Sequence, residues 1–324
     1  MVLIEKDKAR NKALSFSFVR KRIILYPDAN VSQVGDRMKR ILTILIILTL
    51  SLSGCTKKPN EDRLSIVVGV YVLEEFAQRI GGDLVDVVNL VPPGVEAHDF
   101  ELSAQDRILL DKSDVLLAIG SSFESWLDEV ESGLKDTLVV RTGDGLLKNE
   151  SDPHIWLDPM LAKEIAIKIQ NALIEIDLEN ETAYRANTQS LIQELEELDD
   201  LFETSLENRQ RDLFIPAHDA FSYLALAYGL TQRSIAGANP EGDVDAKRLK
   251  EIIDLVNAQK IPVIFSEENL DPKIAEAIAN ETQAIIMALN PIESLSDEDI
   301  EAGESYFSLM EKNLDGLKIA LGAN

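Results

Sequence analysis

Three histidines supply every imidazole side chain of this 324-residue chain: His98, His154 and His218. A neutral imidazole nitrogen is a good ligand for divalent transition metals, and three imidazoles with one carboxylate can form a tetrahedral zinc site. No two of these histidines have the i, i+4 spacing that places two ligands on one face of a helix. A site that contains all three must therefore be assembled from segments that are distant in the sequence.

The composition excludes several other kinds of chemistry. The single cysteine, Cys55, allows neither an internal disulfide nor a cluster of thiolate ligands. Lys and Arg total 32 against 57 Asp and Glu, a formal net charge of −25. This charge argues against a nucleic-acid partner, which requires a basic face to meet the phosphates. Hydrophobic residues make up 45% of the chain, as expected for a folded protein with a sizeable core.

The N-terminal region has the pattern of a secretory signal peptide. Residues 41–53 are 13 uncharged, mostly apolar residues that follow Lys39 and Arg40. They are too few to cross a bilayer, which requires about 20 residues in a helix. A basic start followed by a short apolar centre is typical of a signal peptide. We therefore expect residues 1–54 to be an N-terminal extension and signal peptide, with Met38 as the start of translation.

The signal ends in LSGC (residues 52–55), which resembles a bacterial lipobox. In this interpretation Cys55 becomes the lipid-bearing first residue of the mature protein, and residues 55–63 form a polar tether. Two or more acyl chains on one residue anchor a protein stably, because each buried CH₂ contributes about 0.8 kcal/mol. The sequence thus predicts an extracytoplasmic protein held to the membrane by lipid, at the cell surface or on the periplasmic side.

From residue 64 onward, apolar β-branched runs alternate with segments of helical spacing, which predicts an α/β fold with parallel sheets. We expect two Rossmann-like lobes, residues 64–178 and 212–324. Residues 179–211 are strongly charged and contain no Gly or Pro. They predict a long, rigid connecting helix, although periodicity alone also allows an ordinary surface helix.

The histidines fall at related places in this pattern. His98 follows the expected strand 85–91, and His218 follows the expected strand 213–217. His154 lies just before Asp158-Pro159, which predicts the start of a helix. In open α/β sheets ligands bind at the carboxyl ends of the strands. The three side chains can therefore converge on one cleft, although a lone histidine in a loop is usually a surface residue.

Four segments carry a resemblance to a known family. They are GVEAHDFE (94–101), DPHIWLDP (152–159), HDAFSY (218–223) and LNPIESL (289–295). They resemble the ligand segments of the metal-binding solute-binding proteins of ABC importers, in the zinc/manganese cluster. The resemblance extends over roughly residues 64–321.

The resemblance implies two α/β lobes bridged by a rigid helix, with the metal ion at the lobe interface. It also implies His98, His154, His218 and an acid as ligands. Many relatives have Asp at the position of Asn290. Because an amide is a neutral and poorer ligand, we predict Glu293 as the fourth ligand and give Asn290 at most a supporting role.

The same resemblance favours zinc over manganese. Manganese prefers sites rich in carboxylates, whereas imidazoles suit zinc. Manganese-binding members commonly have an acid where this chain has His218. We therefore predict a receptor that captures Zn²⁺ and delivers it to an ABC permease with its ATPase. It is expected to act as a monomer and to catalyse no reaction. A manganese receptor (Mn²⁺) of the same family is the alternative.

Several neighbouring residues have two interpretations. Glu267 follows the expected strand 261–266 and can either orient a ligand histidine or cap the next turn. Asp99 and Asp219 each follow a ligand histidine, but adjacent side chains tend to diverge, so we expect neither to contact the metal site. Trp126 and Trp156 are expected in the core.

Two further classes of function stay open. A lipid-anchored zinc hydrolase would use the three histidines as ligands and Glu293 or Glu267 as the general base. A bound water facing a pocket would indicate that enzyme, whereas four protein ligands around a buried ion would indicate transport. An adhesin or structural lipoprotein would require no metal site.

Overall fold

The structure is a computed structural model, and it describes residues 63–95, 97–120, 124–148, 152–237, 244–267 and 270–323. The signal segment, Cys55 and nearly all of the expected tether lie outside the described residues. The chain divides into two units, Met1–Asn60 and Glu61–Asn324, and the helices and strands described below all belong to the second. None of the helices in the described ranges combines the length and apolar character needed to span a membrane.

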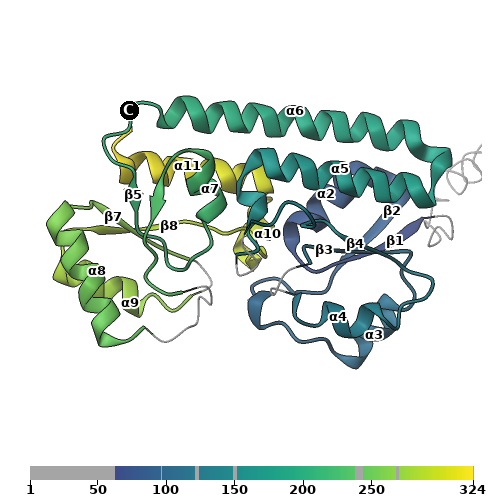
Figure 1. Cartoon of the computed structure of the whole chain (residues 1–324), viewed down its shortest axis with the longest axis horizontal. Coiled ribbons are helices and arrows are strands. Elements are labelled where there is room, and N and C mark those ends of the chain that lie inside the picture. The colour runs from purple at the N-terminus through teal and green to yellow at the C-terminus, as the bar shows by residue number, and fades with distance from the viewer. Residues whose placement is uncertain are drawn as a thin grey trace, which may run out of the picture. The chain divides into compact units, whose positions relative to one another are not determined.

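The first half of this unit is built around a four-stranded parallel sheet with the strand order β2-β1-β3-β4 (Figure 1). Its strands are β1 (Leu64–Val68), β2 (Val85–Asn89), β3 (Val115–Ala118) and β4 (Leu138–Arg141). In β1, Ile66 and Val68 belong to the main hydrophobic core, whereas Val67 belongs to a second cluster on the opposite face. Both faces of the sheet are covered, which explains why Ile66, Val67 and Val68 are apolar in succession.

Short helices cover the two faces of this sheet. The main core receives α2 (Tyr71–Gly81), and the second cluster includes residues of α3 (Ala104–Leu110) and α4 (Leu127–Glu131). Trp126 packs in the second cluster, as the sequence predicts. The described residues of this half include the single turns of 3₁₀-helix η1 (Gly82–Leu84), η2 (Ala97–Asp99) and η4 (Ile155–Leu157).

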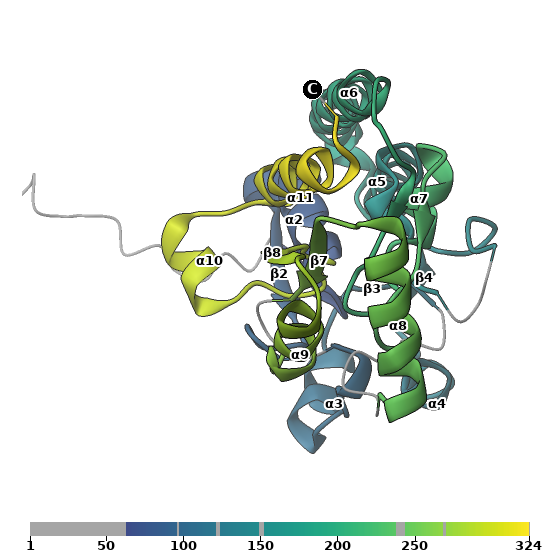
Figure 2. The ribbon, with the colours of Figure 1, turned by 90° about the vertical axis from the view of Figure 1, so that its left-hand side faces the viewer.

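The second half contains two pairs of parallel strands. The first pair is β5 (Leu213–Phe214) with β6 (Thr231–Gln232), and the second is β7 (Val263–Ser266) with β8 (Ile285–Ala288). A hydrogen bond from Phe265 N to Ile215 O (2.8 Å) links the pairs. Helices α8 (Ala246–Gln259) and α9 (Lys273–Glu281) pack here around a smaller core of their own (Figure 2).

Long helices connect the two halves. They are α5 (Pro159–Ile176) and α6 (Glu181–Leu206), joined by η5 (Leu178–Asn180), and α11 (Tyr306–Leu321). Figure 1 shows α6 running along α5 and α11. Asp158 caps α5 by accepting hydrogen bonds from the N–H groups of Met160 and Leu161, and Pro159 occupies the first turn, as the sequence predicts.

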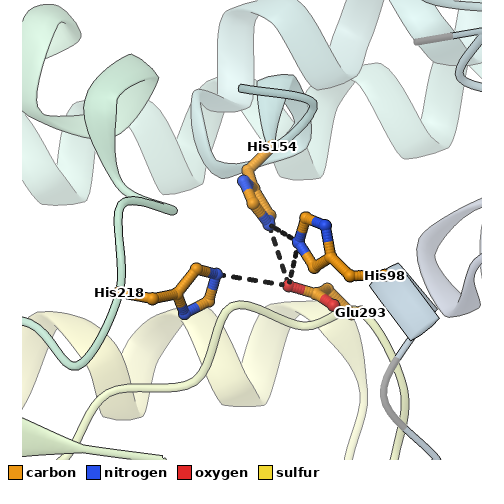
Figure 3. A group of neighbouring side chains, drawn as sticks. All are labelled: His98, His154, His218 and Glu293. Carbon is orange, nitrogen blue, oxygen red and sulfur yellow. Dashed lines mark hydrogen bonds and ion pairs between the residues drawn. The ribbon is translucent and has the colours of Figure 1, made fainter. Parts of the chain in front are cut away.

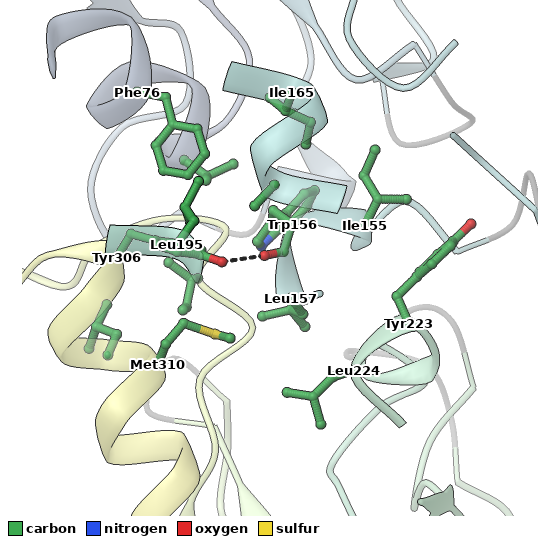
Figure 4. Packing of buried hydrophobic residues seen from close by; sticks show 14 of the residues in the cluster. Phe76, Ile155, Trp156, Leu157, Ile165, Leu195, Tyr223, Leu224, Tyr306 and Met310 are labelled. Carbon is green, nitrogen blue, oxygen red and sulfur yellow. Dashed lines mark hydrogen bonds between the residues drawn. The ribbon is translucent and has the colours of Figure 1, made fainter. Parts of the chain in front are cut away.

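The main hydrophobic core is continuous through this unit. It contains residues of α2, α5, α6, α7 (Ser222–Ala227) and α11 together with Phe265 of β7. Figure 4 shows how Trp156 lies among Phe76, Leu195, Tyr306 and Met310 in this core. Trp156 is fully buried, in agreement with the expectation. This shared core fixes the relative position of the loops that leave the ends of the strands.

The α/β class, the parallel sheets and the long connecting helix are confirmed. The helix predicted to run to residue 211 ends at Leu206 instead. Beyond it, Gln210 N and Arg211 N donate to the carbonyl oxygen of Leu321, so tertiary hydrogen bonds replace the helical ones. Residues of α4, β6 and α10 (Asp297–Ala302) were not predicted as elements, because such short segments show too little periodicity.

Candidate metal centre

Four side chains from distant parts of the sequence meet at one point: His98, His154, His218 and Glu293 (Figure 3). One ligand atom from each lies within 4.8 Å of all the others. Three of the side chains are almost completely buried, and only the His98 side chain retains 14% exposure. The group therefore forms a nearly closed site with one accessible edge.

The fold explains why these positions converge. His98 lies in η2, after β2, and His218 follows β5. Glu293 follows β8, and His154 directly precedes η4. The strands β2, β5 and β8 belong to three separate sheets, and in such α/β folds ligands bind at the carboxyl ends of the strands, where these loops begin.

The distances between the donor atoms suit a small tetrahedral ion. Zn–N bonds of about 2.0–2.1 Å imply donor-to-donor distances of roughly 3.3–3.4 Å in a regular tetrahedron. His98 Nε2 lies 3.3 Å from His154 Nε2, and Glu293 Oε1 lies 2.8 Å from His154 Nε2. Glu293 Oε1 is 3.6 Å from Nε2 of both His98 and His218. The residues present therefore fit a zinc ion.

Unsatisfied polar atoms point to the same conclusion. Within the described residues, His218 Nε2 and Glu293 Oε2 are buried without a hydrogen-bond partner. A buried polar atom without a partner costs about 1–3 kcal/mol. A cation bound to the cluster would offset that cost, because both atoms carry lone pairs that can bind a metal ion.

Two carboxylates hold the outer nitrogens of the histidine rings. Asp152 Oδ1 lies 2.9 Å from His154 Nδ1, and Glu267 Oε1 lies 2.6 Å from His218 Nδ1. An N–H at Nδ1 donates to the carboxylate and leaves the lone pair of Nε2 directed into the site. The contact anticipated for Glu267 is thus present in the structure, whereas sequence analysis missed the role of Asp152. The available signal was an acid two residues before the histidine, where it also accepts a hydrogen bond from His154 N (3.1 Å).

The charges in the metal-free cluster balance one another. Burial by itself lowers the pKa of His154, but hydrogen bonds and charge interactions with Asp152 and Glu293 outweigh it and raise this pKa to about 9. Burial tends to raise the pKa of Glu293, yet its hydrogen bonds with His154 and His98 bring it well below the usual value. A metal ion that binds His154 near neutral pH must therefore displace the proton that His154 carries.

Asn290 shapes the turn that delivers Glu293. Its side-chain oxygen accepts a hydrogen bond from Ile292 N (2.7 Å), which closes an Asx-type turn. Ile292 has φ of 60°, a left-handed conformation that is costly for a β-branched residue. The backbone of Asn290 also exchanges hydrogen bonds with the Asn313 side chain. Asn290 thus supports the loop by local hydrogen bonds.

Asp99 and Asp219 point away from the cluster, as expected for neighbours of buried histidines. Asp99 is exposed, and Asp219 Oδ1 accepts a hydrogen bond from Ser234 Oγ (2.5 Å).

Comparisons with known proteins agree with this geometry. Residues 66–320 match the family model described as "ZnuA: Zinc-uptake complex component A periplasmic". The chain is 33% identical over 304 residues to the zinc-binding lipoprotein AdcA of Streptococcus pneumoniae (strain R6), a match that covers 87% of this chain but 61% of that protein. The chain thus spans about three fifths of the length of this relative. It is 31% identical to the high-affinity zinc uptake system protein ZnuA of Bacillus subtilis, over 80% of this chain and 88% of that protein.

A solved structure shares the fold. It is the Zn(II)-bound ZnuA-like domain of Streptococcus pneumoniae AdcA, with a TM-score of 0.74 and 33% sequence identity. The alignment covers 80% of this chain and 99% of that domain.

Proposed function

Because this chain belongs to the family of periplasmic zinc-uptake complex component A proteins, we propose that it captures a zinc ion and delivers it to an ABC importer. The observation that carries the proposal is the buried cluster of three imidazoles and one carboxylate, whose donor distances suit Zn²⁺. In this proposal His98, His154, His218 and Glu293 are the ligands. The ion lies between an N-terminal lobe (residues 64–178) and a C-terminal lobe (212–324), with residues 179–211 as the connector.

The donor set favours zinc as the cargo. Three imidazole nitrogens and one carboxylate oxygen match the ligands that Zn²⁺ prefers, whereas Mn²⁺ prefers more oxygen donors and a larger coordination number. The relatives from Streptococcus pneumoniae and Bacillus subtilis are both named for zinc.

Capture and release suit this site better than hydrolysis does. A catalytic zinc keeps one coordination position open for water, whereas the four protein donors proposed here would complete a tetrahedron. Glu293 and Glu267, either of which could serve as the general base of a hydrolase, are already engaged with the histidines. The relatives are named for binding and uptake. An adhesin alone would not require this buried arrangement of donors.

The location and partners complete the proposal. Lipid on Cys55 would anchor the protein outside the cytoplasm, and a relative from Streptococcus pneumoniae is named a lipoprotein. A permease with its ATPase would receive the ion from a monomeric receptor. The N-terminal segment of 13 uncharged, mostly apolar residues supports export.

Metal analysis of untagged protein tests the function. Protein purified without an affinity tag, stripped by a chelator and dialysed against equal zinc and manganese should retain about one zinc ion per chain. The single variants His98→Ala, His154→Ala and His218→Ala should each weaken zinc binding, while the exposed-site control Glu175→Gln should not. Retention of manganese in preference to zinc, or no metal at all, would overturn the proposal.

A further inference from the structure

The loop that carries Glu293 is fastened to the first half of the chain, although it follows β8 in the second half. Tyr71 N, at the start of α2, donates to the carbonyl oxygen of Glu293 (2.9 Å). The indole N–H of Trp156 donates to the carbonyl oxygen of Pro291 (2.8 Å). Trp156 is fully buried beside the His154 loop, and its own carbonyl oxygen accepts a hydrogen bond from the Tyr306 hydroxyl (2.6 Å).

The same loop is also joined to the loop of His98. Gly94 N donates to the carbonyl oxygen of Leu295 (2.9 Å), and Ser294 Oγ donates to the carbonyl oxygen of Val95 (3.2 Å). Together with the contact between Glu293 and His154, these bonds tie the loops of three donors to one another. The loops of His98, His154 and Glu293 are therefore held in fixed relative positions by hydrogen bonds.

His218 is attached differently. The backbone around it bonds within the second half: Ala236 N donates to Ala217 O (2.7 Å) and Asp219 N donates to Gly237 O (2.9 Å). Its ring is held by Glu267, which follows β7. Figure 3 shows the ring approaching Glu293 from the side opposite His98, and His218 Nε2 lies 3.6 Å from Glu293 Oε1.

The packing beneath His218 also involves the small core. Ile215, which follows β5, packs in the small core of α8 and α9, whereas Phe214 of β5 belongs to the main core. A cavity of about 290 Å³ lies beside this segment and is lined by Ala217, Phe265 and Ser266 among others. Ala220, two residues after His218, already belongs to the main core. The His218 segment thus packs partly on the small core, whereas Ala97, Ile155 and Ile292, beside the other three donors, belong to the main core.

From these contacts we propose that His98, His154 and Glu293 form a preassembled half-site of three donors. His218, whose ring is hydrogen-bonded to Glu267, is then the closing ligand, and it withdraws when the ion is released. The inference rests on the proposed function, since it takes zinc as the cargo. Capture begins at the three fixed donors, which are reached past the exposed edge of His98. Closure adds the fourth donor, and release reverses that step while the other three stay in place.

Hydrogen exchange on the wild-type protein tests which loops move. Four amide groups report the two attachments: Tyr71 N and Gly94 N for the Glu293 loop, and Ala236 N and Asp219 N for the His218 loop. Removal of zinc should accelerate exchange at Ala236 and Asp219 by about tenfold or more, and at Tyr71 and Gly94 by less than about threefold. Equal acceleration of both pairs, or a larger one at Tyr71 and Gly94, would overturn the inference.

Stopped-flow kinetics with zinc provide a second test. In His218→Ala the association rate should stay within about threefold of wild type, while dissociation accelerates at least about tenfold, because the capturing donors are intact. Glu293→Gln and Trp156→Phe, in contrast, should slow association, because they weaken or displace a member of the half-site. Trp156→Phe retains an aromatic ring in the core but lacks the N–H that holds Pro291. If His218→Ala slows association as much as Glu293→Gln does, the order of capture is wrong.

These outcomes are separable from failure of the proposed function. A wild-type chain that binds no zinc would overturn the function itself, and with it the half-site. If the chain binds zinc tightly but the four amide groups exchange hydrogen at equally accelerated rates after zinc removal, the proposed function stands. Only the division of the ligands into three fixed donors and one mobile donor is then wrong.

Discussion

Substitution of Glu293 by glutamine removes the only anionic donor of the cluster while retaining its length and one carbonyl oxygen. In the wild-type site Glu293 Oε1 lies 2.8–3.6 Å from the three inward-facing ring nitrogens, and the side chain is 5% exposed. Three neutral imidazoles leave the double charge of the zinc ion unchanged, so the buried carboxylate supplies the compensating charge. Loss of that charge should therefore weaken binding substantially.

The size of the effect has a lower bound. Substitution of groups that merely orient ligands typically costs 10–100-fold in metal affinity, and a direct ligand should cost at least as much as the weakest of these. We expect Glu293→Gln to weaken zinc binding at least about tenfold, which corresponds to roughly 1.4 kcal/mol.

A second effect of the substitution has the opposite sign. Glu293 also stabilises the proton on His154 that zinc must displace, and glutamine removes that competition. Near pH 7 this gain offsets part of the loss, whereas at pH 9.5 most of the His154 proton is already absent in the wild type. The loss of affinity should therefore be larger at pH 9.5 than at pH 7.

The assay is a competition titration against a chromogenic zinc chelator at both pH values. Asn290→Ala should cost less than Glu293→Gln, because Asn290 supports only the turn. Glu267→Gln tests the other nearby acid, which contacts His218. If Glu293→Gln binds zinc like the wild type while Glu267→Gln does not, the wrong acid has been assigned and our interpretation of residues 289–295 fails.

Three further predictions concern protons, stability and the anchor. The raised pKa of His154 keeps this side chain protonated in the metal-free site, so its deprotonation alone should lower zinc affinity by about tenfold for each pH unit below 9. Calorimetry in buffers of different ionisation enthalpy should detect at least one proton released per zinc ion at pH 7. Burial raises the pKa of Glu124 to about 7 despite hydrogen bonds from two backbone N–H groups. Since the folded-state pKa lies above the unfolded value, the stability contributed by this group is complete below about pH 4.5 and is lost as the pH rises through 7, by about 3 kcal/mol. The difference in unfolding free energy between wild type and Glu124→Gln should show that pH dependence in urea titrations, and a flat difference, like that given by the exposed Glu175→Gln, would contradict it. Metabolic labelling with a fatty acid should mark the wild-type protein and not Cys55→Ser; an unlabelled wild type recovered free of membranes would exclude the lipid anchor.

Local sequence patterns determined much of the fold. The alternation of apolar runs and helical segments predicted the parallel sheets, and Asp158-Pro159 marked the start of α5 correctly. Helix ends were less predictable, because residues 207–211 have helical composition but their backbone bonds elsewhere, as at Gln210 and Arg211. An alternative partner supplied by the tertiary structure is invisible in a local pattern.

The sequence by itself also selected the chemistry: three histidines and an acid in four motif-like segments suffice to name a candidate zinc site and its family. Tertiary structure decided how these residues meet, since the contact between His98 and His154 joins positions 56 residues apart and that between His154 and Glu293 joins positions 139 apart. It also revealed Asp152 behind His154 and the attachment of the Glu293 loop to Tyr71 and Trp156. Spacing along the chain carries no information on such contacts, because the direction of a side chain and the partner of a loop depend on packing between segments that are distant in sequence.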